Sequence, residues 1–357
     1  MNQPLDRRAF LRRSAGVAAG AVVLGGVPTL LAACGSSKSG TGASASPTTG
    51  KAKVTSQSLQ LSWILDAEFA GYYLAKERGY YKDEGIDLTI IPGGPTAAIE
   101  ATVASGKANL GLSVPDLTAL AMKQGAKFKV IGAQFQQSPL GIMSLKGKGL
   151  LEPKALVGKK VGVPATNRQS VEALLKVNKI DPSSVKILPY SFDPTPVANG
   201  ELDAALAFVT TDPFVLKDKG LETDTFLLAD WGYRTYNDTI FVTEDFLHKN
   251  PETVAGFLRA TIKGWQDNKA DPNAFLPIQQ RLGKDLALSA QSQTFQNQSQ
   301  ITLMENAATT KNGLFWMDQE GIAANVDAMN RVGIAVDASF FTTEVLQSVY
   351  NGKNRIG

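Results

Sequence analysis

The sequence is poor in the residues that carry most redox, metal and acid–base chemistry. Its 357 residues include one cysteine, Cys34, and one histidine, His248, which we expect at an exposed helix end. A disulfide within one chain, a metal cluster, a Cys/His dyad and a Ser/His/Asp triad therefore lack parts. Phosphate-binding loops of the Walker or Gly-x-Gly-x-x-Gly type are also missing. We expect no catalytic residue, no metal site and no cofactor.

The chain also lacks a net charge once its first residues are set aside. Four of its 36 basic and one of its 33 acidic residues precede Cys34, which leaves 32 of each. A chain with equal numbers of acidic and basic residues lacks the excess positive charge typical of proteins that bind nucleic acids.

The first 34 residues have the pattern of an export signal. A charged start at Asp6-Arg7-Arg8 leads into an uncharged run from Ser14 to Ala33, which ends in small residues before Cys34. The paired arginines resemble a twin-arginine signal, and Leu-Ala-Ala-Cys resembles a bacterial lipobox. We expect residues 1–33 to be a signal peptide and Cys34 to carry lipid at the outer face of the cell membrane. The alternatives are a membrane-spanning helix with a chance cysteine, and export in the unfolded state.

The chain after Cys34 divides by composition. Residues 34–56 are rich in Gly, Ser and Thr and have no aromatic residue to bury, so they predict a flexible tether. The rest is too long for one ordinary core and predicts two lobes.

The body alternates short apolar strands with helical patterns, which predicts an α/β fold with largely parallel sheets. The expected strands are 59–63, 86–91, 110–112, 130–135, 160–163, 185–188, 205–209 and 239–242. The expected helices are 69–78, 95–105, a segment opened by Ser113 as N-cap, 168–176, a short helix that begins at 197 and runs into the strand at 205–209, and 251–266, followed by further helices to the end.

One segment resembles a known family. Residues 63–87, from Trp63-Ile64-Leu65-Asp66 to Glu84-Gly85-Ile86-Asp87, resemble the opening of ABC-importer solute-binding proteins for thiamine-pyrimidine precursors and riboflavin. Binders of nitrate, taurine and alkanesulfonates are relatives of that group. Supporting segments are 91–95, 104–111, 156–163 and 199–205, so the resemblance covers roughly residues 58–275.

The resemblance implies a two-lobed, type II periplasmic-binding-protein-like fold with the ligand between the lobes. It implies chain crossings near 138–144 and 237–243. The expected division is 57–140 with 243–357 for the first lobe and 141–242 for the second.

Ligands of open α/β sheets bind beyond the carboxyl ends of the strands. We therefore expect a cleft formed by Trp63, Asp66, Glu68, Phe69, Tyr72, Gly93, Gly94, Ser113, Phe135, Asn167, Arg168, Thr210, Thr211, Trp231 and Tyr236. Several have simpler explanations: Tyr72 as core, Trp63 as core or wall, Ser113 as a helix cap, Arg168 as a merely exposed residue or in a salt bridge, and Gly93-Gly94 as a turn.

The resulting hypothesis is a monomeric, non-enzymatic receptor that closes on a small solute and delivers it to the permease and ATPase subunits of an ABC importer. The expected solute is a polar aromatic heterocycle, because aromatic side chains stack on flat rings and unpaired acids repel anions. The alternatives are a sulfonate, taurine or nitrate-like anion, and an enzyme of the pyrimidine-synthase-like branch.

Overall fold

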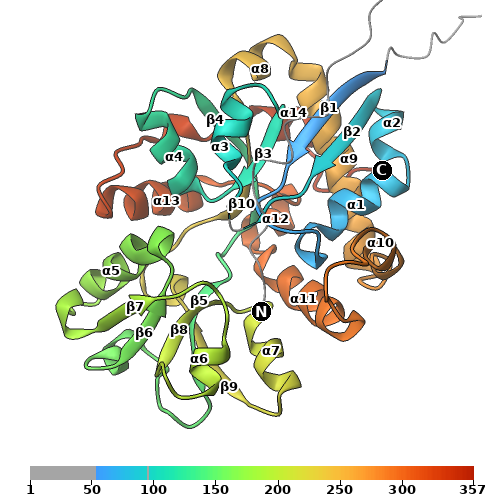
Figure 1. Cartoon of the computed structure of the whole chain (residues 1–357). Helices are drawn as coiled ribbons and strands as arrows, with labels where there is room; N and C mark the ends of the chain where they lie inside the picture. The colour runs from blue at the N-terminus through green and yellow to red at the C-terminus, as the bar shows by residue number, and fades with distance from the viewer. Residues whose placement is uncertain (1–53, 95) are drawn as a thin grey trace, which may run out of the picture. The chain divides into compact units, whose positions relative to one another are not determined.

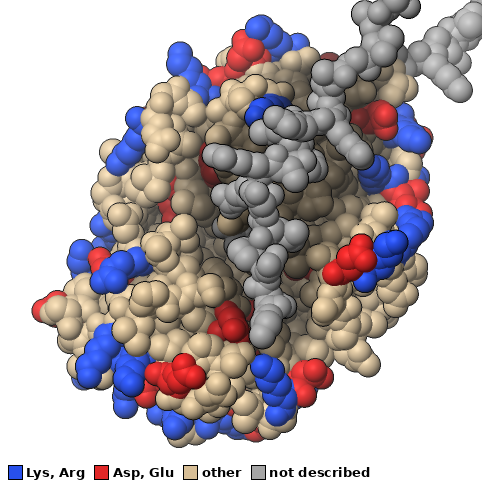
Figure 2. All heavy atoms as spheres, viewed as in Figure 1, with Lys and Arg blue, Asp and Glu red and all other residues tan. Residues whose placement is uncertain are grey.

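The computed structural model describes residues 54–94 and 96–357. The expected signal peptide, Cys34 and nearly all of the expected tether lie outside the described residues. β1 begins at Thr55, so the last two residues of the expected tether belong to a strand instead. Within the described part, no helix is long and apolar enough to cross a membrane. On the face shown in Figure 2, acidic and basic side chains are interspersed.

The first lobe is built on a mixed five-stranded sheet with the order β2-β1-β3-β10-β4 (Figure 1). Its strands are β1 (Thr55–Gln60), β2 (Ile86–Ile91), β3 (Leu110–Ser113), β4 (Phe128–Phe135) and β10 (Asn237–Thr243). β1 pairs in parallel with β2 and β3, whereas β10 runs antiparallel to β3 and β4.

The second lobe repeats this plan in the order β7-β6-β8-β5-β9. Its strands are β5 (Leu140–Leu145), β6 (Lys160–Val163), β7 (Lys186–Pro189), β8 (Ala204–Phe208) and β9 (Thr223–Leu227). Here β5 is the antiparallel strand, paired with β8 and β9. The fourth strand of each sheet, β10 in the first lobe and β5 in the second, is the first strand that the chain forms after it crosses from the other lobe.

Helices cover both sheets. Those before β5 are α1 (Ala70–Glu77), α2 (Tyr80–Asp83), α3 (Ile99–Ala104) and α4 (Pro115–Lys123). The helices between β6 and β9 are α5 (Arg168–Val177), α6 (Thr195–Ala198) and α7 (Asp212–Asp218). After β10 come α8 (Glu244–Lys249), α9 (Pro251–Ala270), α10 (Leu276–Leu282), α11 (Ala290–Leu303), α12 (Ala307–Asn312), α13 (Gln319–Arg331) and α14 (Glu344–Tyr350). The 3₁₀ turns are η1 (Ala67–Phe69), η2 (Pro153–Leu156), η3 (Ala165–Asn167), η4 (Pro182–Ser184), η5 (Ala229–Trp231) and η6 (Ala338–Phe340).

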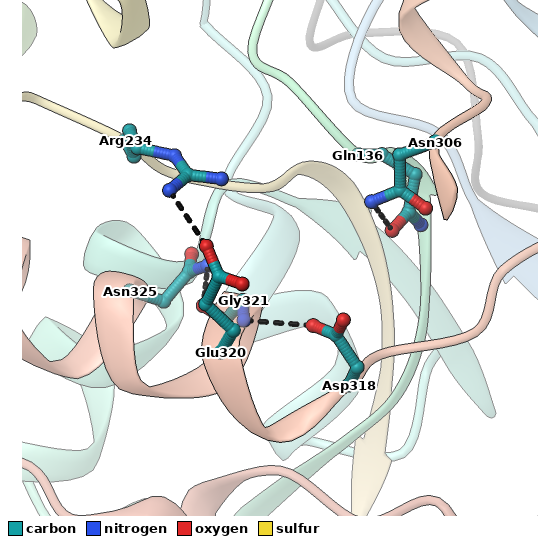
Figure 3. A network of polar contacts seen from close by, with 7 residues as sticks. All are labelled: Gln136, Arg234, Asn306, Asp318, Glu320, Gly321 and Asn325. Carbon is teal, nitrogen blue, oxygen red and sulfur yellow. Dashed lines mark hydrogen bonds and ion pairs between the residues drawn. The ribbon is translucent and has the colours of Figure 1, made fainter. Parts of the chain in front are cut away.

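The chain crosses between the sheets at 136–139 and at 228–236, and the C-terminal helices hold both crossings (Figure 3). Asn306, at the start of α12, donates to Gln136 in the first crossing at 3.2 Å. In the second crossing Arg234 pairs with Glu320 of α13 at 3.1 Å. The crossings also meet each other, because Ser138 N–H donates to the Thr235 carbonyl at 3.1 Å.

The first core depends on a close crossing of α1 and α9. A Cβ added to Gly264 would lie 2.1 Å from the Gly71 carbonyl oxygen, so the two backbones touch where neither residue has a side chain. Trp265 then packs on edge against Tyr72 with ring centroids 6.1 Å apart, and both rings are fully buried. This contact fixes the helix that follows β1, and with it the turn before that helix.

The sequence predicted β2 and β6 residue for residue, and it placed most other elements within a few positions. Three expectations were wrong. Ser113 ends β3 instead of capping α4, whose N-cap is Val114. Residues 237–242, expected in the second lobe, form β10 in the first sheet. Strand β5 was not predicted, because residues 138–144 were interpreted only as a crossing. Strand β9 was not predicted either.

Candidate functional site

A cavity of about 660 Å³ lies where the two lobes meet, within the 300–1,000 Å³ range of small-molecule sites. The first lobe contributes the chain after β1, the end of β3, the start of β10 and the start of α11 with the residues just before it. The second lobe contributes η3, the end of β8 and α7. The lining residues are Ser62, Trp63, Ile64, Asp66, Glu68, Ile99, Ser113, Val114, Leu117, Leu140, Thr166, Asn167, Phe192, Phe208, Thr211, Asp212, Phe214, Val215, Asp218, Lys219, Asn237, Asp238, Ala287, Leu288, Ser289, Ser292, Gln293 and Gln296.

Six of the expected ligand residues line this cavity: Trp63, Asp66, Glu68, Ser113, Asn167 and Thr211. Trp63 is half-buried, packs against the first core and also faces the cavity, so it is both wall and core. Ser113 donates its hydroxyl to the Glu100 carboxylate, and its carbonyl accepts from Thr239 at 2.8 Å.

The other nine expected residues do not line the cavity. Phe69, Tyr72, Phe135, Thr210 and Tyr236 are at most 2 % exposed and belong to the interior. Gly93 donates its N–H to the Trp63 carbonyl at 2.7 Å, and Gly94 has a φ of 145°, so this pair makes the turn. Arg168 is exposed and pairs with Glu172 one helical turn away, and Trp231 packs on Phe226 in the second lobe.

Three buried carboxyl groups stand together on the first-lobe side. Asp66 caps η1 by accepting from Glu68 N–H at 2.9 Å, and Asp238 accepts from the Ser62 hydroxyl at 2.7 Å. Glu68 and Asp238 share a hydrogen bond when one of them is protonated. Asp238 also has a φ of 43°, a left-handed conformation that non-glycine residues adopt mainly where the surroundings enforce it.

Burial dominates the ionisation of these acids. It raises the pKa of Asp66 to about 7, although hydrogen bonds from Gln296 and from the Glu68 backbone act in the opposite direction. Burial and the neighbouring Asp238 and Asp66 carboxylates raise the pKa of Glu68 well above its usual range. At neutral pH the group therefore holds protons and presents both donors and acceptors to the cavity.

Side-chain amides hold the acid-bearing turn in place. Gln293 Oε1 accepts from Ala67 N–H at 2.7 Å, and Gln300 Nε2 donates to the Ala67 carbonyl at 2.6 Å. Gln134 Nε2, from β4, donates to the Glu68 carbonyl at 2.7 Å. All three glutamines are at most 2 % exposed, so η1 is held on several sides by buried hydrogen bonds.

The second-lobe side of the cavity contributes most of its aromatic side chains. Phe192, Phe208 and Phe214 face it, and Phe192 has a φ of 58°. Its buried acid, Asp212, accepts from Phe208 N–H at 3.0 Å and from the Thr211 hydroxyl at 3.2 Å, while burial raises its pKa to about 7. One cation, Lys219, reaches the lining from α7.

The sequence interpretation missed Ser62, Asp238, Gln293 and Gln296 as site residues. Ser62 lies in the expected first strand, and Asp238 is the second residue of β10, a strand that was expected to begin at residue 239. Gln293, Gln296 and Gln300 are spaced i, i+3, i+7, which puts three amides on one helical face. That spacing was the available signal. Among the described residues, no group of three or more His, Cys, Asp or Glu has metal-binding geometry.

The two five-stranded mixed sheets with a cavity between them define a periplasmic-binding-protein-like fold. The periplasmic aliphatic sulphonate binding protein SsuA from Escherichia coli has the same fold, with a TM-score of 0.62 and 13 % sequence identity. The match covers 83 % of this chain and 99 % of that one.

Within that class, the chain belongs to the family described as NMT1/THI5 like, whose sequence model matches residues 66–275. It is 26 % identical to the riboflavin-binding protein RibY of Chloroflexus aurantiacus, over 85 % of this chain and 90 % of that protein. It is 28 % identical to the formylaminopyrimidine-binding protein of Halalkalibacterium halodurans, over 62 % and 68 %. It is 27 % identical to the 4-amino-5-hydroxymethyl-2-methylpyrimidine phosphate synthase of Legionella pneumophila, over 60 % and 68 %.

Proposed function

We propose that this protein is the solute-binding component of an ABC importer and captures a neutral or cationic nitrogen heterocycle, such as a pyrimidine or a flavin. The observation that carries the proposal is the group of buried carboxyls, Asp66, Glu68 and Asp238, beside the exposed face of Trp63. The names of two relatives, the riboflavin-binding and formylaminopyrimidine-binding proteins, support the same solute class.

The charge of the lining favours such a solute over an anion. Five acidic side chains, those of Asp66, Glu68, Asp212, Asp218 and Asp238, face the cavity against the single Lys219. A sulfonate would be repelled by whichever of these carboxyls is ionised, and the repulsion grows as pH rises and more of them lose their protons. Ring nitrogens and amino groups instead offer the donors and acceptors that a partly protonated carboxyl group can match.

The aromatic lining fits the ring system. Trp63 faces the cavity from the first lobe, and Phe192, Phe208 and Phe214 face it from the second. A flat heterocycle between these side chains gains roughly 0.5–1.5 kcal/mol per aromatic pair beyond the burial of area. Closure of the lobes on the ring would bring the two sets together.

Titration calorimetry and thermal shift at pH 8 test the proposal with riboflavin, 4-amino-2-methylpyrimidine, taurine, methanesulfonate and nitrate. We expect a heterocycle to bind at micromolar or lower Kd and the anions to leave the melting temperature unchanged. Binding of taurine or nitrate alone would overturn the solute class. The double variant Asp66→Asn, Glu68→Gln provides the control, because neutral amides should weaken the heterocycle and improve any anion.

The synthase relatives make turnover the second measurement. The purified protein is incubated for hours with each solute that binds, and the solute is recovered and weighed by mass spectrometry. We expect it unchanged. A modified product would replace the receptor function with an enzymatic one.

We also propose that the protein is exported and held at the outer face of the cell membrane by lipid on Cys34. The support is the sequence pattern of residues 1–34. Cys34→Ser should release the protein into the medium and abolish labelling by a radioactive fatty acid. Arg7-Arg8→Lys-Lys should block export if the twin-arginine route is used.

A further inference from the structure

The glutamines of α11 form a hydrogen-bond chain that has only one possible direction. Ala67 N–H is a backbone donor, so the atom of Gln293 that meets it at 2.7 Å must be the amide oxygen. Gln293 Nε2 then donates to Gln296 Oε1 at 3.2 Å. Gln296 Nε2, in turn, donates to Asp66 Oδ2 at 3.0 Å. The orientation of every amide follows from the fixed backbone donor at the start of the chain.

We propose that Gln293 and Gln296 are positioning residues, which hold Asp66 as an ionised hydrogen-bond acceptor at the cavity and so set the protein's preference for solutes with an N–H donor. An amide flipped at Gln296 would place oxygen against Asp66 and favour a protonated carboxyl. The hydrogen bond from Ala67 N–H to Gln293 prevents that flip. The amide side chains of Gln293, Gln296 and Asn297 are at most 2 % exposed, so water does not replace these contacts. Asp66 therefore keeps a donor aimed at it.

The surroundings of Asp66 oppose its ionisation, which makes the amide donor consequential. Burial is the main cause, and the neighbouring carboxyl groups Glu68 on η1 and Asp238 on β10 add to it, while burial keeps the nearby Tyr73 phenol of α1 protonated and neutral. Across the cavity α7 contributes the acids Asp212 and Asp218 and the cation Lys219. Two contacts favour the Asp66 anion: the hydrogen bond from the Gln296 side-chain amide and the one from the Glu68 backbone N–H.

The direct test follows the carboxyl carbon of Asp66 by NMR in ligand-free protein labelled at aspartate, with Asp66→Asn as the assignment control. In the wild type the signal should titrate near pH 7. In Gln296→Met, which keeps the shape and removes the donor, the midpoint should rise by about one pH unit. Gln293→Met should give a smaller rise, because Gln296 loses its fixed orientation.

Gln300→Met is the matched control on the same helix face. Gln300 Nε2 donates hydrogen bonds to the Ala67 carbonyl and to Asn297 Oδ1, but it makes none to the Asp66 side chain. It should lower the melting temperature and leave the Asp66 midpoint in place. An unchanged midpoint in folded Gln296→Met, or in folded Gln293→Met if the first variant does not fold, would overturn the proposal. An equal shift in Gln300→Met would do the same.

The consequence for affinity rests on the proposed function and is measured separately. Riboflavin affinity should rise with pH through about 7 in the wild type and through about 8 in Gln296→Met, so the loss of affinity relative to the wild type should be about fivefold larger at pH 7 than at pH 9. A loss of the same size at every pH would reduce Gln296 to a structural role and overturn the proposal. An Asp66 shift without any riboflavin or aminopyrimidine binding would leave the positioning role intact and reject the proposed solute.

Discussion

The two lobes have the same strand order but very different interiors. The first lobe contains most of the buried polar side chains, including Asp66, Glu68, Gln293 and Gln296, whereas the second core is almost wholly aliphatic and aromatic, with Asp212 as its buried acid. Buried polar groups need defined partners and therefore specify a geometry, while apolar surfaces tolerate small shifts in position. The first-lobe side of the cavity is therefore more narrowly defined in geometry than the second-lobe side.

The largest expected effect concerns the tight helix crossing found in the first lobe. Gly264→Ala places a methyl group 2.1 Å from the Gly71 carbonyl, so α1 and α9 must separate. We expect a loss of more than about 4 kcal/mol in the free energy of unfolding, measured by urea denaturation, despite the better helix propensity of alanine.

Gly162→Ala in β6 is the matched variant in the second lobe. Its new methyl group meets Leu202 Cδ1 at 2.6 Å and the Tyr190 ring at 3.0 Å, which are side chains that can move. The expected cost is about 1–3 kcal/mol. Equal losses in the two variants would show that the first lobe is no more constrained than the second.

The second prediction uses the buried acid of the second lobe. The pKa of Asp212 is about 7 when folded and lies near its ordinary value of 3.8 when unfolded, so the folded state binds the proton more tightly. Its contribution to stability is complete below about pH 4 and is lost as pH rises to about 7. Asp212→Asn should remove on the order of 4 kcal/mol of that decline.

The measurement is the free energy of unfolding of ligand-free protein between pH 4 and pH 8. Asparagine can accept from Phe208 N–H and donate to the Thr211 hydroxyl, so the fold should persist. The decline that remains in the variant belongs to Asp66, Glu68, Asp116 and Asp238 of the first lobe. An unchanged slope would contradict the burial of Asp212.

The third prediction compares two tryptophans. Trp63→Ala should weaken heterocycle binding at least tenfold, about 1.4 kcal/mol, because the ring faces the cavity. Trp231→Ala removes a ring that packs on Phe226 outside the lining, so it should lower stability and leave affinity unchanged. Calorimetric titration of both variants decides, and an unaltered Kd for Trp63→Ala would assign that ring to the core alone.

The smallest effect is expected at a contact between the lobes. Phe214 on α7 and Phe295 on α11 lie with ring centroids 5.3 Å apart beside the cavity. Phe295→Ala should speed dissociation of the solute about threefold, in line with roughly 0.5–1.5 kcal/mol for an aromatic pair. Stopped-flow displacement measures the rate. Phe340→Ala, a buried aromatic far along the chain in the first lobe, should affect stability and not dissociation.

Local sequence patterns were enough to predict most elements, but only four of the first-lobe residues that line the cavity: Trp63, Asp66, Glu68 and Ser113. Trp63, Asp66 and Glu68 were found because they directly follow a strand, and strand ends form the edge where ligands bind. Gln296 was not found because it meets Asp66 across 230 positions in the sequence. Tyr72 and Tyr236 were assigned to the cleft by residue type, but their rings pack inward, and only tertiary packing determines that direction.

The crossing pattern has a consequence for the order in which the protein can assemble. The second sheet uses one continuous stretch of chain, from Leu140 in β5 to Leu227 in β9, so every strand is available once that stretch has been made. The first sheet cannot join β3 to β4 until β10 arrives between them, about a hundred residues later. During synthesis the first lobe, with its buried acid group, is therefore completed last, around an already formed neighbour.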